Sequence, residues 1–140
     1  MINKFEQISL KPGFMKHNGG RMFKTISAKE YQFKAIINEN HLNAAGITHG
    51  GFIAAFIDAG AGTAAHRSAN KSPCVTISLE LKFISVVKLG QELIGNTKIQ
   101  KKTKSIVFLT CELTAENKIV ATASGVWKIL KKLPGAGPGG

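Results

Sequence analysis

The chain is poor in the residues that build cross-linked or metal-bound folds. Its 140 residues include only two cysteines, Cys74 and Cys111, and one tryptophan. The cysteines form no CxxC pair and stand in no His/Cys cluster at metal-ligand spacing, which excludes the common zinc motifs. Both lie in segments patterned as strands, so we interpret them as reduced core thiols rather than as a disulfide or as metal ligands.

A membrane-spanning run is also missing. The longest apolar stretch, Gly51 to Ala65, is shorter than the ~20 residues that cross a bilayer, and Asp58 interrupts it. The first ten residues, MINKFEQISL, lack the apolar core of a signal peptide. We therefore expect a cytoplasmic protein with no membrane partner.

Acidic residues are scarce, with 8 against 19 Lys and Arg, which gives a net charge of +11. Such a field attracts polyanions: nucleic acid, an anionic membrane surface or a phosphorylated small molecule. Nearly all of the cations are lysines, whereas nucleic-acid recognition often depends on arginine, and the aromatic residues are not interleaved with the basic runs. Nucleic acid is therefore not the favoured partner.

A hydrophobic content of 44% and this length fit one globular domain, over residues 1–130. Its first thirty residues carry Pro12, Gly13, Gly19 and Gly20 and read as a short helix or turn followed by a loop. The tail 131–140 is rich in glycine and proline, and we expect it to be disordered. There are no internal repeats.

Period-two alternation and turn residues predict five strands, at 31–38, 75–83, 93–100, 105–114 and 119–130. In the segment 75–83 the apolar odd-numbered residues are expected on one side and Thr76, Ser78, Glu80 and Lys82 on the other. The apolar stretch Gly51–Ala65 is too long for a typical strand, so it predicts a helix buried on nearly every side. This order indicates an α+β fold in which one antiparallel sheet wraps a single long helix.

Small residues run along the predicted helix, so another element can pack very close to it. They are Ala54, Ala55, Ala59 and Gly62. Asp58, the only aspartate, lies in the middle of the same helix. An isolated carboxylate in an apolar setting is costly, so it is usually paired, neutralised or excluded. Asp58 is therefore either a structural residue paired with Lys or Arg or facing water, or a functional one.

The segment Asn43–Gly51, NAAGITHGG, ends where the helix begins. Glycines after His49 leave the first-turn amides open, and those N–H groups with the helix dipole suit a developing oxyanion. A glycine-rich turn or a merely hydrogen-bonded histidine would look the same. Together with Asp58, however, the segment supplies the two halves of a hydrolytic site.

The two halves cannot meet within one chain. Gly50 and Asp58 are eight helical residues apart, or ~12 Å at 1.5 Å per residue, whereas an attacking water and a polarised carbonyl must lie within ~3 Å. A two-fold dimer with antiparallel helices would bring Asp58 of one chain toward His49 and Gly50 of the other. The small residues of the helix would permit that approach.

The spaced motif N-x5-H-G-G-x6-D resembles the signature of hotdog-fold acyl-CoA thioesterases of the phenylacetate-degradation (PaaI-like) type. The resemblance runs from about the first strand to Leu130 and includes VTISLELKF followed by KLGQEL. It implies an antiparallel sheet of five or six strands around one long central helix, a dimer usually doubled to a homotetramer, and active sites at the dimer interface. It implies an acyl-CoA substrate and no cofactor, since coenzyme A is part of the substrate.

By the same resemblance, Asp58 would be the catalytic carboxylate, as general base or nucleophile, with the Thr76 hydroxyl orienting the water. The Gly50 amide of the partner would polarise the thioester carbonyl, and the partner's Asn43 and His49 would position water and acyl group. The remaining substrate-binding assignments are Gly51 and Ser78, and for the phosphates of coenzyme A the loop residues Lys101, Lys102, Lys104 and Ser105. Taken alone, the segment KKTK is most simply a solvated hairpin tip.

Several alternatives stay open. Gly60–Ala65 and Glu80 match a dinucleotide fingerprint, but the match lies inside the predicted helix and the chain has no room for a second βαβ half. A hotdog dehydratase would need other motifs. A non-catalytic acyl-CoA-binding module would have no need of Asp58, and a small basic nucleic-acid binder is supported by charge alone.

Overall fold

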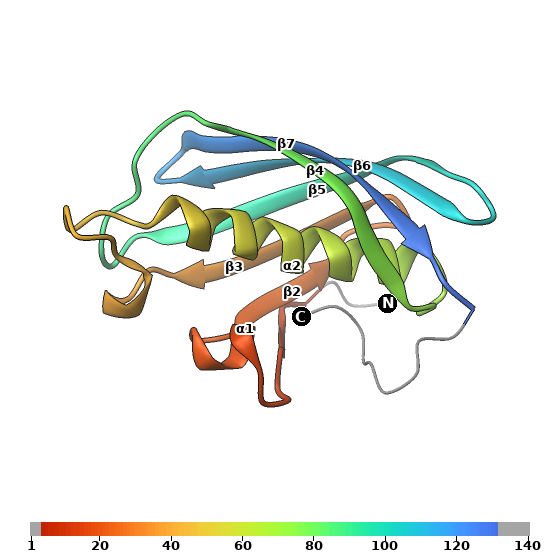
Figure 1. Cartoon of the computed structure of the whole chain (residues 1–140), viewed down its shortest axis with the longest axis horizontal. Coiled ribbons are helices and arrows are strands. Elements are labelled where there is room, and N and C mark those ends of the chain that lie inside the picture. The colour runs from red at the N-terminus through yellow and green to blue at the C-terminus, as the bar shows by residue number, and fades with distance from the viewer. Residues whose placement is uncertain (1–3, 132–140) are drawn as a thin grey trace.

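The computed structural model describes residues 4–131, and the glycine- and proline-rich tail predicted to be disordered lies outside them from residue 132 onward. Seven strands, two α-helices and one 3-10 helix make up the described chain (Figure 1). In chain order they are β1 (Glu6–Ile8), α1 (Phe14–His17), β2 (Arg21–Thr25), β3 (Glu30–Ile36), η1 (Glu39–His41), α2 (Gly50–Ser68), β4 (Cys74–Phe83), β5 (Glu92–Lys102), β6 (Ile106–Ala115) and β7 (Lys118–Ile129).

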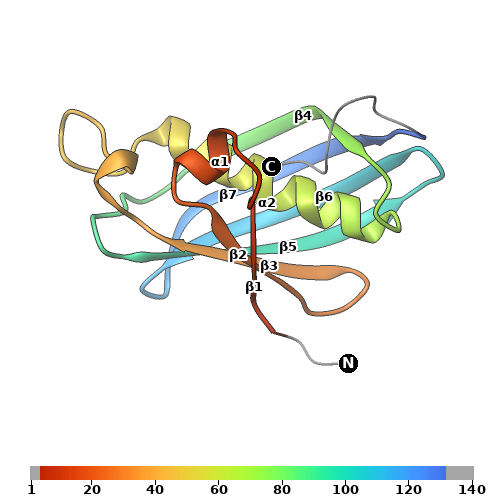
Figure 2. The same ribbon diagram turned by 90° about the horizontal axis from the view of Figure 1, so that it is seen from below.

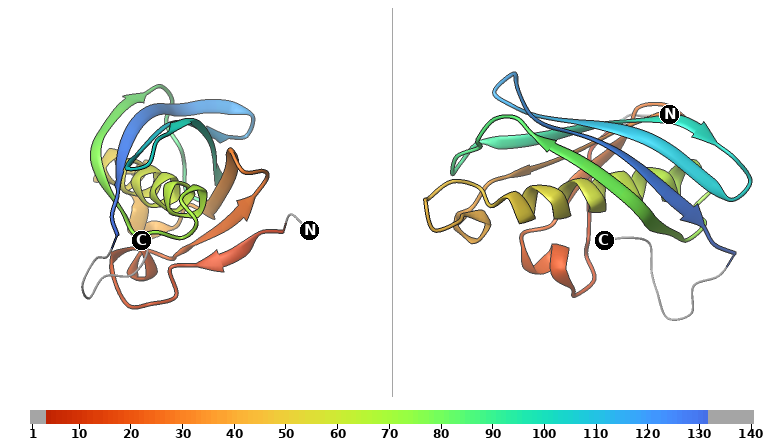
Figure 3. Two further views of the ribbon diagram at one scale, coloured as in Figure 1. Left: turned by 90° about the vertical axis from the view of Figure 1, so that its right-hand side faces the viewer. Right: turned by 45° about the horizontal axis from the view of Figure 1, so that its top comes forward.

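The strands form one antiparallel sheet in the order β1-β2-β3-β5-β6-β7-β4. The sheet curls around α2, which lies inside the curl, while α1 and β2 lie on the side of α2 away from β6 and β7 (Figures 1, 2 and 3). The α+β architecture expected from the sequence, one sheet wrapped around one helix, is confirmed.

Two glycines let the helix approach the sheet closely. A Cβ atom at Gly60 of α2 would lie 2.4 Å from the ring of Phe33, and one at Gly95 of β5 would lie 2.3 Å from the same ring. Phe33 is fully buried and packs against Phe56 at a centroid distance of 4.9 Å. Gly60 of the helix and Gly95 of the sheet therefore make room for the buried ring of Phe33.

The strand count is higher than the expected five or six because the first thirty residues contain β1 and β2 as well as the short helix α1. These strands have three and five residues, too short for alternation to stand out beside Pro12 and the neighbouring glycines. In the sheet, Phe23 of β2 is nevertheless fully buried. The predicted loop is therefore part of the sheet.

The expected alternation of residues 75–83 is wrong at one point, because β4 contains a β-bulge. Thr76 pairs with Trp127 and Ser78 pairs with Val126, so Ile77 is an extra residue between them. Residues before and after a bulge are shifted in phase. Thr76 therefore shares the helix-facing side with the buried Trp127, while Ser78 stays on the outer side with Val126.

The order of the last strands also differs from a simple meander. β4 pairs with β7 at the end of the sheet, not with β5, and residues 84–91 connect β4 to β5 across the molecule. β5 itself continues through Lys102, so the predicted loop at 101–104 is shorter than expected. The side of β4 that does not face β7 has no strand partner within the described chain.

Candidate active site

Asp58 and Thr76 are brought together, as the family resemblance implied. Asp58 lies in the middle of α2 and is partly exposed, and the Thr76 hydroxyl of β4 donates a hydrogen bond to its Oδ1 atom at 2.7 Å. The bulge at Ile77 makes this contact possible, because without the bulge the Thr76 side chain would point to the outer face of the sheet. The structure therefore builds a carboxylate–hydroxyl pair at the edge of the sheet.

Asp58 is not held in an ion pair. Within residues 4–131 no Lys, Arg or His nitrogen lies within 4.0 Å of its carboxylate. The structural explanation by a salt bridge, left open by the sequence, therefore does not apply to the described chain. One side of the carboxylate is fixed by Thr76, and the partial exposure leaves room for water on the other.

The nearest buried cation, Arg21 of β2, serves the helix backbone. Its Nη2 atom donates to the Ala59 carbonyl at 3.0 Å and to the Thr63 hydroxyl at 2.7 Å, and Nη1 donates to Ser9. Burial lowers the pKa of Arg21 to about 10, and the negative charge of Asp58 opposes that shift. The guanidinium is therefore charged at neutral pH and fixes the middle of α2 next to Asp58. No local pattern in the sequence marks Arg21 as part of the site.

The accessible side of α2 is narrow and lined by small residues. Gly51, Ala54, Ala55 and Asp58 are at least partly exposed, while most of the rest of the helix is buried. Their spacing of three and four residues places them on one stripe of a helix. The other two small residues expected on this face, Ala59 and Gly62, are buried within the chain. The helix is thus open along one stripe, and Asp58 lies on it.

The first turn of α2 leaves one amide without an acceptor. His49 is the N-cap, and its Nδ1 atom accepts from the Gly51 N–H at 2.7 Å, while the amides of Phe52 and Ile53 donate to the His49 carbonyl. The Gly50 N–H has no acceptor within the described chain. A free N–H at a helix N-terminus is suited to stabilise an oxyanion.

The chain's own packing does not require glycine at position 50. A Cβ atom there would lie 3.6 Å from the ring of Phe83, which is an ordinary contact, and the backbone is not in the left-handed region. At Gly51, by contrast, a Cβ atom would lie 2.8 Å from Nδ1 of His49. The small size of Gly50 therefore leaves its amide accessible to a ligand.

The side chain of His49 is left with one free nitrogen. Because Nδ1 accepts from a backbone N–H, the neutral ring carries its proton on Nε2, which can donate to a ligand. Asn43 lies in the preceding loop, where its Oδ1 atom accepts from the amides of Ala45 and Ile47 at 2.9 and 3.3 Å. The Asn43 oxygen is thus used to shape the loop, and its amide nitrogen remains as a donor.

The structure keeps the two halves of the site apart within one chain. Gly50 begins α2 and Asp58 follows eight residues later on the same straight element, a separation of ~12 Å along the axis. Asp58 meets Thr76, whereas Asn43, His49 and Gly50 gather at the start of the helix. A single copy therefore presents two partial sites.

The remaining sequence-predicted residues lie away from both halves. Ser78 lines a shallow hollow on the outer face of the sheet with Gln100 and Ser124. Lys101 pairs with Phe108 and Lys102 with Val107, so these two side chains point to opposite faces of the sheet. Lys104 and Ser105 follow in the turn, whose Thr103 hydroxyl accepts from the amides of Ser105 and Ile106.

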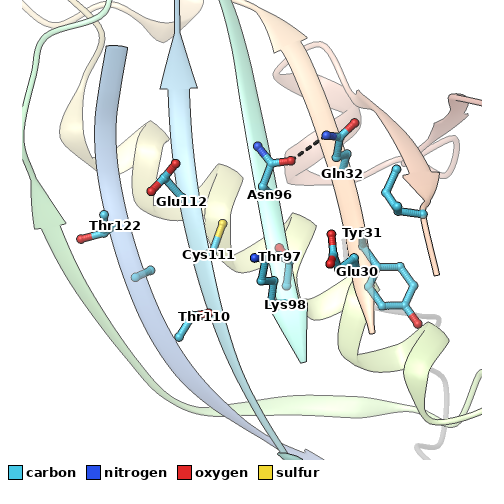
Figure 4. A pocket seen from close by; sticks show the side chains of 12 residues that line it. Glu30, Tyr31, Gln32, Asn96, Thr97, Lys98, Thr110, Cys111, Glu112 and Thr122 are labelled. Carbon is cyan, nitrogen blue, oxygen red and sulfur yellow. Dashed lines mark hydrogen bonds between the residues drawn. The ribbon is translucent and has the colours of Figure 1, made fainter. Parts of the chain in front are cut away.

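One hollow of the described surface lies away from Asp58. It measures about 580 Å³ and lies over β3, β5, β6 and β7 on the outer face of the sheet, with α2 behind it (Figure 4). One rung of this face carries Gln32, Asn96, Glu112 and Thr122, and the Gln32 amide donates to Asn96 at 2.6 Å. The sheet separates this polar hollow from the helix stripe.

Exposed apolar side chains gather in β4 and in the connection that follows it. Of the eleven large hydrophobic residues that are exposed in the described chain, six lie in the segment 75–89, which begins on the edge strand β4, paired with β7 on one side only. An open edge strand with apolar side chains promotes association with another chain. The six are Val75, Ile77, Phe83, Ile84, Val86 and Leu89.

Cys74 and Cys111 are free thiols, as expected from the sequence. Cys111 is buried and Cys74 is partly buried, and burial raises the pKa of Cys111 to about 12. Within the described residues no three His, Cys, Asp or Glu side chains form a potential metal site, and no helix there is long and apolar enough to span a bilayer. Residues 60–65, the dinucleotide-like match, lie within α2 and form no phosphate-binding loop.

A curled antiparallel sheet around one helix, with a carboxylate on that helix, is the hotdog architecture that the sequence predicted. The family model of the thioesterase superfamily matches residues 45–122, more than half of the chain. The chain belongs to the thioesterase superfamily.

Two relatives illustrate the similarity in sequence. "Putative esterase PA0474" of Pseudomonas aeruginosa is 34% identical over 94 residues, which are 66% of this chain and 70% of that protein. Human acyl-coenzyme A thioesterase 13 is 29% identical over 87 residues, which are 61% of this chain and 62% of that protein. The second match thus covers less than two thirds of its relative.

Solved structures share the fold at low sequence identity. Zebrafish thioesterase superfamily member 2 has a TM-score of 0.79 and 20% identity, covering 87% of this chain and 90% of that one. The phenylacetic acid degradation protein PaaI of Thermus thermophilus has a TM-score of 0.71 and 21% identity, covering 83% and 97%. A hypothetical thioesterase protein of Streptococcus pneumoniae, solved with coenzyme A, has a TM-score of 0.73 and 15% identity, covering 90% of this chain and 95% of that one.

Proposed function

We propose that the protein is an acyl-CoA thioesterase that hydrolyses the thioester of an acyl- or aryl-CoA to the free acid and coenzyme A. The observation that carries the proposal is Asp58: a carboxylate without a cationic partner, bonded to the Thr76 hydroxyl, on the open stripe of the central helix. Membership of the thioesterase superfamily and the acyl-CoA thioesterase among its relatives support it.

We infer that the active unit is a dimer of identical chains. The unpaired edge of β4, the apolar segment 75–89 and the small-residue stripe of α2 together form a surface that a second copy can cover. A two-fold axis beside this stripe would set the two helices antiparallel. Asp58 of one copy would then face His49 and Gly50 of the other, which completes the two partial sites.

In this arrangement each group has a defined task. The Gly50 N–H of the second copy would donate a hydrogen bond to the thioester carbonyl oxygen and stabilise the negative charge that develops there. Asp58 would take a proton from water, whose oxygen bonds to the carbonyl carbon, and Thr76 would fix the orientation of the carboxylate. Collapse of the tetrahedral intermediate breaks the C–S bond, and the proton passes to the leaving sulfur.

Direct attack by Asp58 on the carbonyl is the alternative, which would form an anhydride and release the thiol before water enters. Both routes need the same residues. His49, through Nε2–H, and the Asn43 amide would position water and acyl group, and Gly51 would hold His49 through its N–H. Incorporation of ¹⁸O from labelled water into Asp58 in a single turnover would distinguish the nucleophilic route.

The phosphates of coenzyme A would be bound by Lys101, Lys102, Lys104 and Ser105 near the β5–β6 turn. All three lysines are exposed, so they would act as hydrated point charges. Because Lys101 and Lys102 point to opposite faces, each would contact a different part of the nucleotide. A tetramer of two dimers, a cytoplasmic location and the role of Ser78 stay predictions.

A panel of acyl-CoA and aryl-CoA esters with detection of the released thiol tests the proposal. We expect hydrolysis of at least one member with a kcat of order 1 s⁻¹ or more. Tight binding of acyl-CoA without hydrolysis of any member would instead identify a binding module. If no member of the panel is bound or hydrolysed, the proposal is wrong.

A further inference from the structure

We propose that His41 is a positioning residue for the active site. Its neutral ring holds the loop that contains Asn43 and His49 against the first turn of α2. This inference rests on the proposed thioesterase activity. His41 is 2% exposed and both of its ring nitrogens are bonded to backbone atoms, so it would act through the loop. It is the last residue of η1 and stands at the entrance of the loop.

The hydrogen bonds of the ring define its protonation state. Nδ1 lies 3.0 Å from the backbone nitrogen of Asn38, and Nε2 lies 2.6 Å from the backbone oxygen of Asn18. A backbone N–H can only donate and a carbonyl can only accept, so Nδ1 is bare and Nε2 carries the proton. The ring is therefore neutral, both of its nitrogens are occupied, and it has no capacity left for proton transfer to a substrate.

The same ring is stacked on the helix. Its centroid lies 3.8 Å from that of Phe52 with an interplanar angle of 13°. Phe52 is the third residue of α2, two positions after Gly50. The ring thus connects three elements: α1 through Asn18, η1 through Asn38 and the first turn of α2 through Phe52.

The backbone of His41 closes the loop at its base. The His49 N–H donates to the His41 carbonyl at 2.7 Å, and Leu42 and Thr48 form an isolated β-bridge above it. Thr48 donates from both its amide and its hydroxyl to the Val87 carbonyl, at 3.0 and 2.8 Å. A displacement of His41 would therefore pass directly to His49 and to the loop that holds Asn43.

The inference concerns turnover more than binding. His49 and Gly50 act on the reacting carbonyl, whereas the nucleotide of coenzyme A would bind elsewhere. A misplacement of about 1 Å in such groups can lower a rate by about 10²-fold. Loss of the His41 ring contacts should accordingly lower kcat and leave KM nearly unchanged.

Three variants separate the contributions of the ring. His41→Phe keeps the stack on Phe52 and removes both hydrogen bonds. His41→Asn places an amide oxygen near the position of Nδ1, where it can accept from Asn38, and removes the stack. His66→Phe is the matched control, because His66 also bonds a backbone oxygen, that of Ser72 at 2.8 Å, but lies in the last turn of α2.

Two readouts are measured on the full chain: kcat and KM for the best acyl-CoA of the panel, and hydrogen exchange of the amides in residues 42–49. For His41→Phe we expect kcat to fall about 10- to 100-fold, KM to change less than about threefold, and the loop amides to exchange faster. His41→Asn should recover part of kcat, and His66→Phe should match the parent in both readouts.

A kcat of His41→Phe within about twofold of the parent would overturn the inference. So would a large loss of kcat with unchanged exchange in residues 42–49, which would mean that His41 acts on the reaction directly. If His41→Phe does not fold, His41→Asn decides by the same two readouts. If the parent hydrolyses no thioester, the proposed function fails, and the exchange measurement alone still decides whether His41 fixes the loop.

Discussion

Replacement of Asp58 by asparagine removes the proposed base and little else. The Thr76 hydroxyl donates to the Asp58 Oδ1 atom, and the amide oxygen of asparagine can accept the same hydrogen bond. The side chain keeps its size on the open stripe of α2. No salt bridge within the described chain is lost, because Asp58 has none there.

The expected magnitude follows from this geometry. A neutral amide cannot take a proton from water, and loss of a positioned base costs about 10²- to 10⁴-fold in rate. Each factor of ten corresponds to about 1.36 kcal/mol, so the barrier should rise by at least about 2.7 kcal/mol. Stability should change by less than about 1.5 kcal/mol, the scale of one hydrogen bond.

The assay is thiol release from the best acyl-CoA substrate, together with urea unfolding of the parent and the Asp58→Asn variant. Thr76→Val is the companion variant: it keeps the carboxylate but frees its orientation, so a smaller loss of kcat is expected. An Asp58→Asn protein that keeps more than about a tenth of kcat would refute the assignment. A large loss of stability with either variant would instead indicate a structural role for the pair.

Three further predictions concern packing, charge and pH. Gly60→Ala should lower the free energy of unfolding by about 1–2 kcal/mol, since overpacking against Phe33 outweighs the gain in helix propensity. Gly62→Ala should cost less, because its Cβ atom would lie 3.3 Å from Nε1 of Trp127, whereas a Cβ atom at Gly60 would lie 2.4 Å from the ring of Phe33; urea midpoints check both. Charge reversal at the three lysines in 101–104 should raise KM for acyl-CoA and flatten the salt dependence of that KM. Hydrolysis of an acyl-pantetheine thioester should be unaffected, because that substrate lacks the nucleotide phosphates. Burial raises the pKa of Cys111 from 9.0 to about 12, so the unfolded chain loses this proton first as pH rises. Stability should therefore decline above about pH 9, by up to about 1.36 kcal/mol per pH unit from this thiol alone, and Cys111→Ala should remove that part of the slope in urea titrations.

Regular patterns in the sequence were sufficient for the main elements. Alternation located β3 and β5 to β7, and an apolar run too long for a strand located α2. Strands too short to show a clear alternation were missed, as with β1 and β2, because β1 takes its place in the sheet by pairing with β2, and β2 by pairing with β3. The bulge at Ile77 was also lost, because alternation in sequence carries no sign of an extra residue.

The site residues were likewise predictable only where a local pattern in the sequence marked them. Asp58 stood out as the only aspartate in an apolar helix, and the glycines after His49 indicated its N-terminus. His41 and Arg21 did not stand out, because their roles arise from partners 23 and 38 residues away, at Asn18 and Ala59. The spacing Asn38-x-x-His41, typical of a capping pair, was the one local signal for His41.

The most direct test of a site shared between two chains is a mixing experiment with two inactive variants. Asp58→Asn removes the base, and Gly50→Pro removes the free amide. Proline is tolerated at the first position of a helix, and the extended backbone of His49, with ψ of 131°, suits a residue before proline. Gly50→Ala, which keeps the N–H, is the control for added bulk.

Each heterodimer of the two variants should hold one site with both lesions and one with neither. An equal mixture after full subunit exchange should therefore regain about a quarter of the parent activity, since about half of the dimers are mixed and half of their sites are intact. Native mass spectrometry measures the exchange in the same sample. Heterodimers that form but show no more activity than the separate variants would contradict the shared site.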